Sequence, residues 1–146
     1  MRTAYDYPGW MRADAVSSGD PLAEARAYLG APYEWGGMTE AGIDCSGLVH
    51  MAFRRAGVVV PRDADQQEEA GARLDDSALR PGDLVTYGEE GADHIAFWAG
   101  EGTILHATGR AGVESVVEEP EPPELSRRRR RLIRLGASLD PGRRPS

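Results

Sequence analysis

The residues best suited to chemistry in this sequence are one cysteine and two histidines. Cys45, the only cysteine among 146 residues, stands between Asp44 and Ser46, and Asp44 is a typical helix N-cap. The N–H groups and partial positive charge at a helix N-terminus lower the pKa of a thiol and favour the reactive thiolate. His94 and His106 lie downstream, each in an apolar stretch typical of a strand. One reactive thiol with two positioned imidazoles predicts a cysteine hydrolase.

The two histidines occur on either side of a predicted hairpin. A Gly-Glu-Gly turn at residues 100–102 separates their strands, with His94 six residues before it and His106 four residues after it. We therefore expect the two side chains to be offset neighbours, with a ring nitrogen of one bonded to the other. A base oriented by a third group follows the logic of a catalytic triad. His50 follows Cys45 by five residues on the same predicted helix, so it projects away from the sulfur and receives no role.

Each of these residues also has an alternative interpretation that composition and spacing leave open. A lone cysteine is more often a small buried side chain than a nucleophile. Either histidine alone is more often a structural residue satisfied by one hydrogen bond. Cys45, His94, His106 and an aspartate could in principle bind zinc. The sequence has no closely spaced ligand pair such as Cys-x-x-Cys, so we expect no metal and no cofactor.

The elements that must position these residues come in the order helices first, strands afterwards. The N-cap, proline and glycine signals predict three helices, over residues 21–29, 45–56 and 64–70. Period-two patterns predict five strands, over residues 84–87, 94–99, 103–107, 113–117 and 131–135. This order predicts an α+β domain, in which the helix that begins at Cys45 packs on an antiparallel sheet of about five strands.

Two charged segments flank the last predicted strand. Residues 118–124 combine four glutamates with three prolines, and we interpret them as a stiff acidic loop, because proline cannot serve a central strand. Residues 127–131 are five arginines, which can mark an anionic partner surface. The nearby acidic run is expected to neutralise them locally, so we interpret them as a solvated entry to the last strand.

The composition excludes several classes of protein. A formal net charge of -7 argues against general nucleic-acid binding. No stretch approaches the roughly 20 apolar residues of a membrane span, so we expect no membrane insertion. We expect one monomeric domain over residues 20–138, with an N-terminal arm at 1–19 and a C-terminal tail at 139–146. Residues 1–10 lack an apolar signal segment, so a complete chain is expected in the cytoplasm and a processed one outside it.

Several motifs, taken together and in order, resemble one family. They are Tyr-Glu-Trp-Gly-Gly at 33–37, Gly-Ile-Asp-Cys-Ser-Gly-Leu-Val at 42–49, Pro-Arg-Asp at 61–63, Pro-Gly-Asp-Leu-Val at 81–85, His-Ile-Ala-Phe-Trp-Ala-Gly at 94–100 and Ile-Leu-His-Ala at 104–107. This pattern resembles the NlpC-type bacterial cell-wall cysteine peptidases over about residues 20–135. The resemblance implies a papain-like fold, with the catalytic helix first and the histidine-bearing sheet second.

The resemblance also implies roles for individual residues. Cys45 would be the nucleophile, His94 the general base and acid, and His106 the orienting group. Tyr33 is a candidate oxyanion donor beside the Cys45 N–H, with packing against the catalytic helix as its equal alternative. Asp44 and Ser46 flank the thiol and could bind the free amine or polar groups of the substrate, although Asp44 could equally serve only as the N-cap.

The implied reaction is hydrolysis of peptidoglycan stem peptides or muropeptides through a thioester. The bond would be the one between γ-D-glutamate and a diamino acid, diaminopimelate or lysine. Two other functions stay open. One is an amidase or N-acyltransferase on the same fold that acts on another amide. The other is a non-catalytic domain that binds cell-wall peptides in the same cleft.

Overall fold

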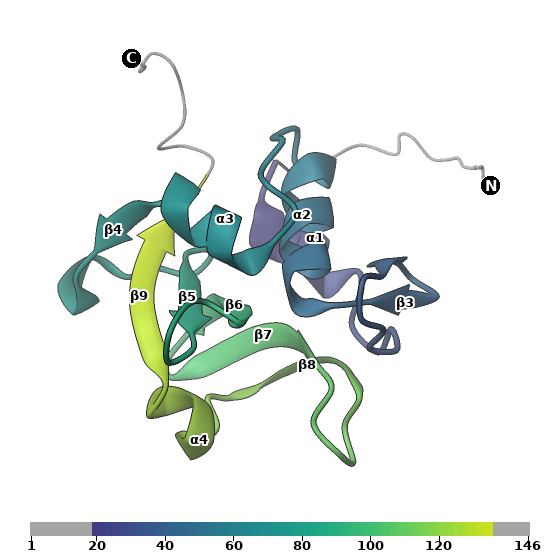
Figure 1. Ribbon diagram of the computed structural model, residues 1–146. Coiled ribbons are helices and arrows are strands. Elements are labelled where there is room, and N and C mark those ends of the chain that lie inside the picture. The colour runs from purple at the N-terminus through teal and green to yellow at the C-terminus, as the bar shows by residue number, and fades with distance from the viewer. Residues whose placement is uncertain (1–18, 136–146) are drawn as a thin grey trace.

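In the computed structural model, which describes residues 19–135, helices precede and cover an antiparallel sheet (Figure 1). The helices are α1 (Pro21–Arg26), α2 (Cys45–Arg55), α3 (Ala64–Ala70), α4 (Pro123–Ser126) and the 3₁₀ turn η1 (Asp76–Ala78). The sheet contains β4 (Ala72–Leu74), β5 (Leu84–Tyr87), β6 (His94–Gly100), β7 (Thr103–Thr108), β8 (Ser115–Pro120) and β9 (Arg129–Arg134), in the spatial order β4-β9-β5-β6-β7-β8. A separate short pair, β2 (Met38–Thr39) and β3 (Gly42–Ile43), precedes α2.

Helix α2 is defined by signals at both ends and by one apolar face. The carboxylate of Asp44 caps its first turn by accepting the N–H of Gly47. Gly57 follows its last turn with a φ of +95°, a conformation that glycine adopts without strain. Phe53 is buried on the inner face, and its ring stacks on Phe97 of β6 with 6.0 Å between centroids. The helix that begins at Cys45 is thereby fixed against the centre of the sheet.

Alternate residues of β6 face two separate cores. Ile95 and Phe97 belong to the larger core, which α1 and α2 cover. Ala96 belongs to a smaller core on the opposite face, which Leu125 of α4 covers. His94 shares the face of Ala96, and Figure 1 shows α4 lying at the far end of the sheet from α1 and α2. The strand therefore separates the apolar core under α2 from a second layer that contains the first histidine.

The α+β architecture agrees with the sequence prediction, and the differences lie at element ends. Helix α1 ends at Arg26, followed by turns to Gly30, and β8 begins two residues later than expected because Glu114 turns the chain with a φ of 49°. The sheet has a sixth strand, β4, whose three residues are too few to give a strand pattern. The predicted arm at 1–19 and tail at 139–146 lie outside the described residues, except for Gly19.

The interpretation of residues 118–124 as a loop is wrong. Residues 118–120 complete β8, and residues 123–126 form α4 with a proline in its first turn. Proline is acceptable here because β8 is an edge strand, and Pro120 is its last residue. The acidic segment is therefore part of the sheet and lies beside the histidine strands.

The arginine run is also more structured than the sequence suggested. Each arginine from 128 to 131 pairs with a different carboxylate, namely Asp93, Glu121, Glu68 and Glu69 in that order. Only Glu121 comes from the nearby acidic run, so the expected local neutralisation holds for Arg129 alone. These pairs join β9 to α3 and to the segment after β8, and they join the residue before β9 to the loop before β6.

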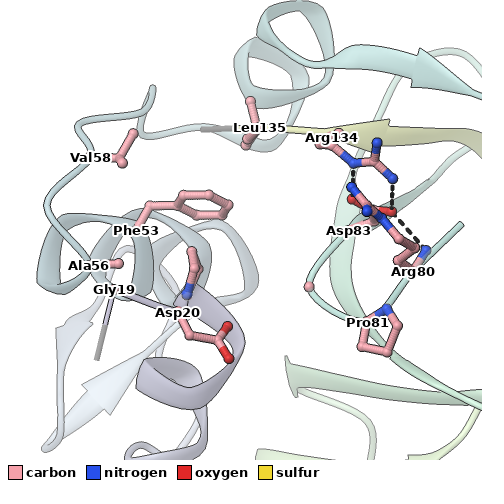
Figure 2. Close-up of a pocket in the computed structure, with 12 residues that line it drawn as sticks. Gly19, Asp20, Phe53, Ala56, Val58, Arg80, Pro81, Asp83, Arg134 and Leu135 are labelled. Atoms are coloured by element: carbon pink, nitrogen blue, oxygen red, sulfur yellow. Dashed lines mark hydrogen bonds and ion pairs between the residues drawn. The ribbon is translucent and has the colours of Figure 1, made fainter. Parts of the chain in front are cut away.

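The last strand is held at its other end by Asp83. The guanidinium of Arg134 donates to both carboxylate oxygens at 2.8 and 2.9 Å, and the N–H of Arg80 donates at 2.8 Å (Figure 2). Figure 2 shows this cluster facing Phe53 of α2 and Ala56, the residue that follows the helix, across a surface hollow. Within residues 19–135 no helix is both long enough and apolar enough to span a bilayer.

Candidate active site

Cys45 lies at the first position of α2 and is only 8% exposed. The backbone N–H groups of Ile95 and Ser46 lie close enough to its sulfur to act on the pKa of the thiol. The sulfur therefore lies at the start of β6, beside the peptide bond that follows His94. The structure thus places the thiol next to the residue that follows the first histidine.

The expected depression of the thiol pKa is wrong for the free protein. Burial raises the pKa of Cys45 to about 11, and the nearby Asp44 carboxylate adds to the effect. The N–H group of Ile95 on β6 and the N–H groups of Ser46 and Cys45 at the helix N-terminus act in the opposite direction, but they are outweighed. The resting group is therefore a neutral thiol.

The two histidines touch, as the hairpin offset predicts. Nε2 of His94 lies 2.7 Å from Nδ1 of His106, and the rings meet edge to face with centroids 5.0 Å apart. Burial lowers the pKa of His94 to about 3, helped by the charges of His106 and Arg128, and burial also lowers the pKa of His106. Both imidazoles are therefore neutral near pH 7.

The polar chain continues beyond His106 to residues for which the sequence suggested no role. Nε2 of His106 lies 2.7 Å from a carboxylate oxygen of Glu119 on β8. Arg110 then donates to both oxygens of Glu119, at 2.8 and 3.2 Å. A signal for Glu119 was present, because alternation along β8 places it on the same face as His106, one diagonal step away. The interpretation of residues 118–124 as a loop hides this alternation, because a loop has no faces on which residues alternate.

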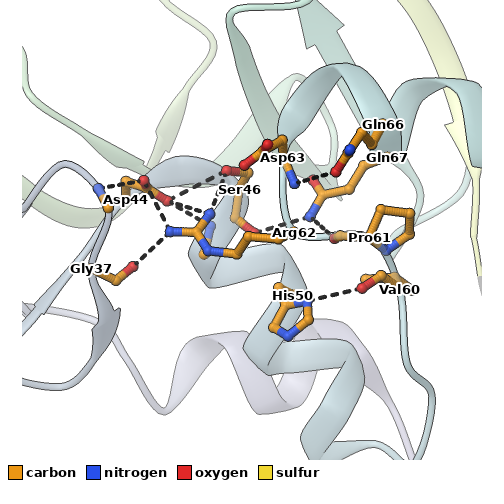
Figure 3. A network of polar contacts seen from close by, with 12 residues as sticks. Gly37, Asp44, Ser46, His50, Val60, Pro61, Arg62, Asp63, Gln66 and Gln67 are labelled. Atoms are coloured by element: carbon orange, nitrogen blue, oxygen red, sulfur yellow. Dashed lines mark hydrogen bonds and ion pairs between the residues drawn. The ribbon is translucent and has the colours of Figure 1, made fainter.

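A second polar cluster lies beside the thiol (Figure 3). Asp44 accepts the N–H groups of Gly47 at 2.7 Å and Gly36 at 2.8 Å. Arg62 lies 3.1 and 3.2 Å from the two oxygens of Asp44 and donates to the hydroxyl of Ser46 at 2.8 Å. The N-cap role of Asp44 is confirmed, and its carboxylate is already bonded on both oxygens. Arg62 is the member of this cluster to which the sequence assigned no function.

Close backbone packing explains two glycines of this region. A Cβ built on Gly47 would lie 2.4 Å from the carbonyl oxygen of Gly37, and a Cβ on Gly37 would lie 2.3 Å from that of Gly42. No side chain fits either space. The loop before α2 can therefore lie directly on the first turn of the helix. This places an N–H of the loop, from Gly36, and one of the helix, from Gly47, against Asp44.

Tyr33 lies in the groove that leads to the thiol. This groove, of about 460 Å³, is lined by Tyr33, Trp35, Gly36, Asp44, Cys45, Ser46, Arg62, Asp63, Ala64, Asp65, Ala92 and Asp93. Burial raises the pKa of Tyr33, as do the nearby Cys45 and Asp44. Its ring also packs on Gly109, where an added Cβ would lie 3.1 Å away. Tyr33 therefore both lines the groove and packs on the loop after β7.

A second hollow, of about 370 Å³, adjoins the groove. Its lining residues are Asp93, His94, Thr108, Arg110, Glu124, Leu125 and Arg128. Asp93 lines both hollows, so the two adjoin at this residue, with Cys45 in the lining of the first and His94 in that of the second. Among the described residues no three histidine, cysteine or acidic side chains are arranged to hold a metal ion. The chemistry available here is that of a thiol and a chain of neutral imidazoles.

Comparison with curated proteins finds enzymes of the bacterial cell wall. The peptidoglycan endopeptidase RipB of Mycobacterium tuberculosis is 35% identical over 108 residues, which cover 65% of this chain and 45% of RipB. A protein of Corynebacterium glutamicum named a probable endopeptidase is 36% identical over 110 residues, or 72% of this chain and 52% of its own. The γ-D-glutamyl-L-lysine dipeptidyl-peptidase of Bacillus cereus is 31% identical over 110 residues, covering 73% and 31% of the two chains. This chain thus spans about half or less of each relative.

Solved structures show the same fold. An NlpC/P60 protein of Bacillus cereus superposes with a TM-score of 0.73 at 30% identity, covering 80% of this chain and 40% of that one. RipD of Mycobacterium tuberculosis, described as a non-catalytic NlpC/P60 domain protein, superposes at 0.68 over 87% of this chain and all of its own, but at 23% identity it shows the fold alone. Residues 30–129 match the NlpC/P60 family. The papain-like layout, the Asp-Cys-Ser helix start and these matches show that the chain belongs to the NlpC/P60 family.

Proposed function

We propose that this domain is a cysteine endopeptidase that hydrolyses peptidoglycan stem peptides. The observation that carries the proposal is the presence of the thiol and the paired imidazoles near one end of β6. The Cys45 sulfur lies near the N–H of Ile95, the residue after His94, and Nε2 of His94 lies 2.7 Å from Nδ1 of His106. The names of RipB and of the Bacillus cereus dipeptidyl-peptidase support the substrate class and, for the second, a γ-D-glutamyl bond to a diamino acid.

The proposed reaction starts from a neutral thiol and a neutral imidazole. Nδ1 of His94 has no hydrogen-bond partner among the described residues, so it can take the thiol proton as sulfur attacks the carbonyl carbon. The tetrahedral oxyanion collapses to a thioester, and His94 returns the proton to the leaving amine. His94 then removes a proton from water, which attacks the thioester and releases the acid and the free thiol. The backbone N–H of Cys45 and the hydroxyl of Tyr33 are the proposed oxyanion donors.

The groove beside the thiol is suited to a cationic group of the substrate. Asp63, Asp65 and Asp93 line it, of which Asp93 is paired with Arg128, and its one arginine, Arg62, is bonded to Asp44. We assign Asp44 and Ser46 to substrate binding together with Tyr33, because all three line the groove next to Cys45. A free amine of a stem peptide would meet carboxylates there, and we propose the bond between γ-D-glutamate and diaminopimelate or lysine as the one cleaved.

Mass spectrometry of defined muropeptides incubated with the purified protein tests this proposal. Wild-type protein should release an L-Ala-γ-D-Glu fragment, and Cys45→Ala should release none. His50→Gln is the matched control on the same helix, because His50 only donates to the carbonyl of Val60 at 2.9 Å, and a glutamine amide can do the same. This variant should keep full activity.

The other outcomes separate the remaining alternatives. Cys45-dependent cleavage at another amide, or transfer of an acyl group, would retain the thiol chemistry and overturn the proposed bond. Binding of muropeptides with no Cys45-dependent product would favour a non-catalytic domain. The raised pKa of the buried thiol is the observation in favour of that second function.

A further inference from the structure

We infer that Glu119, held in place by Arg110, is a positioning residue that fixes the tautomers of His106 and His94 and thereby presents a basic nitrogen to Cys45. This inference rests on the proposed function for its catalytic consequence, whereas the tautomers themselves can be observed directly. It concerns a residue on β8, two strands away from the strand that carries the base.

Glu119 is ionised in the folded protein. Partial burial alone would raise the pKa of its carboxyl group, but hydrogen bonds from Arg110 and His106 outweigh burial and leave the pKa below its ordinary value. The group is therefore a carboxylate near pH 7, and a carboxylate only accepts hydrogen bonds. At 2.7 Å from Glu119, Nε2 of His106 must carry a hydrogen.

The position of that hydrogen determines where the other ring hydrogens of His106 and His94 are. His106 is fully buried and neutral, so its single ring hydrogen is on Nε2, and Nδ1 has a lone pair. Nε2 of His94 lies 2.7 Å from that lone pair and must donate to it. Neutral His94 then carries its only hydrogen on Nε2, which leaves Nδ1 as the base. One carboxylate thus decides the hydrogen positions on both rings.

The same chain stabilises the state that follows proton transfer. When His94 takes the thiol proton it becomes a cation, and its Nε2–H still donates to His106. The negative charge of Glu119 lies at the far end of this hydrogen-bonded chain, in a region of low dielectric. Arg110 lies 34% exposed on the other side of Glu119 and keeps the carboxylate oriented by a two-point contact.

Replacing the carboxylate by an amide should reverse the hydrogen positions. In Glu119→Gln the amide has one oxygen, and the guanidinium of Arg110 takes it because Arg110 can only donate. The NH₂ group is then left facing His106, which must accept through Nε2 and move its hydrogen to Nδ1. His106 would then donate to His94, whose hydrogen would move to Nδ1 and block the base. Glu119→Asp keeps the charge and should preserve the wild-type order.

Glu118 offers a matched control on the same strand. Its carboxylate also forms a two-point pair with an arginine, Arg26, at 3.0 and 3.1 Å, but that pair is exposed and touches neither histidine. Glu118→Gln therefore removes the same charge from β8 and breaks a similar ion pair. It should leave the tautomers and the activity unchanged.

The test is NMR of the ¹⁵N-labelled full chain, in which long-range couplings distinguish the protonated ring nitrogen of each histidine. We expect Nε2–H on both His94 and His106 in the wild type, Glu118→Gln and Glu119→Asp, and Nδ1–H on both in Glu119→Gln. Amide dispersion in the same spectra shows whether each variant is folded. Nδ1–H in the wild type, or unchanged tautomers in folded Glu119→Gln, would overturn the inference.

Kinetics on the muropeptide substrate provide the second measurement. By analogy with the loss caused by a wrong histidine tautomer in a serine protease triad, kcat should fall about 10²–10⁴-fold in Glu119→Gln, with KM within about twofold and recovery in Glu119→Asp. A folded Glu119→Gln with normal kcat would also overturn the inference. If the wild type cleaves no muropeptide, the proposed function fails, but the NMR result still decides the tautomers.

Discussion

Two polar networks lie near Cys45, and they are built in different ways. The network of Asp44, Ser46 and Arg62 ends on backbone N–H groups and on a guanidinium, so no hydrogen in it changes from one atom to another near pH 7. The network that runs from His94 through His106 to Glu119 consists of side chains from three neighbouring strands. Its imidazoles can each hold a hydrogen on either nitrogen. The first network therefore holds the shape of the site, and the second decides where protons go.

The largest expected effect comes from removing the base of the second network. His94→Gln retains a polar side chain of similar size but has no nitrogen that takes up a proton near pH 7. By analogy with removal of a member of the subtilisin triad, we expect kcat for muropeptide hydrolysis to fall at least about 10⁴-fold, with little change in KM. Steady-state kinetics with a defined muropeptide check this. Loss of less than tenfold would show that His94 is not the base.

The pH dependence of the rate at which iodoacetamide alkylates Cys45 tests whether the resting thiol is neutral or already paired with an imidazolium of the second network. Because burial raises the pKa of Cys45 to about 11, the thiolate fraction should increase about tenfold for each pH unit between pH 6 and 9, a rise of about 10³ in alkylation rate. A catalytic thiolate already paired with an imidazolium would instead react at a constant rate over this range.

The alkylation experiment has its control in His94→Gln. Burial and Asp44, not the histidine, raise the pKa of the thiol, so this variant should show the same slope as the wild type. A plateau that appears only in the wild type would contradict the description of the resting site as two neutral groups. The alkylation rate of glutathione, measured at the same pH values, corrects for any pH dependence of iodoacetamide itself.

Breaking the first network should affect stability more than chemistry. Arg62→Met leaves the carboxylate of Asp44, which is 7% exposed, without its cationic partner. Because Arg62 is partly exposed, we expect about 2 kcal/mol of lost unfolding free energy, less than for a fully buried pair. Urea denaturation measures it. Arg26→Met, which breaks an exposed pair with Glu118, should cost about 0–1 kcal/mol, and an equal loss in both variants would contradict the comparison.

The smallest expected effect tests the close packing in the first network. In Gly47→Ala the new methyl would lie 2.4 Å from the carbonyl oxygen of Gly37 and 2.9 Å from Asp44. We expect about 1–2 kcal/mol of destabilisation, because the loop must move away from the helix. Gly91→Ala is the control, since nothing lies within 4 Å of its added methyl. Thermal unfolding of both variants would detect the difference, and equal melting temperatures would exclude tight packing at Gly47.

The parts of the site that sequence predicts are those fixed by neighbours along the chain. Asp44 caps a helix through a residue three positions away, and a hairpin turn fixes the register that brings His94 and His106 together. Glu119 could not be predicted in this way, because the prolines around it indicate a loop unless the strand is known to be at an edge. Arg62 acts across 16 to 25 residues of sequence.

The predicted direction of the shift in the pKa of Cys45 is wrong for a related reason. The local signal, a cysteine at a helix start, indicates a lowered pKa. How much solvent a sulfur loses depends on what packs over it, here β6 and the loop before the helix, and that is a property of the whole fold. We still predict catalytic roles for Cys45, His94 and His106. We also still predict binding roles for Tyr33, Asp44 and Ser46, and the experiments above test both sets.

Strand β8 has a consequence for the behaviour of the protein at high concentration. Exposed sheet edges are templates on which a second chain can add a strand and start aggregation. Along β8 the outward-facing backbone groups of Val116 already bond with Gly30 and Ala31, and Pro120, two steps further along that edge, has no N–H to offer. At the opposite edge, β4 is only three residues long. The edge strand that supplies Glu119 is therefore also protected against intermolecular strand pairing.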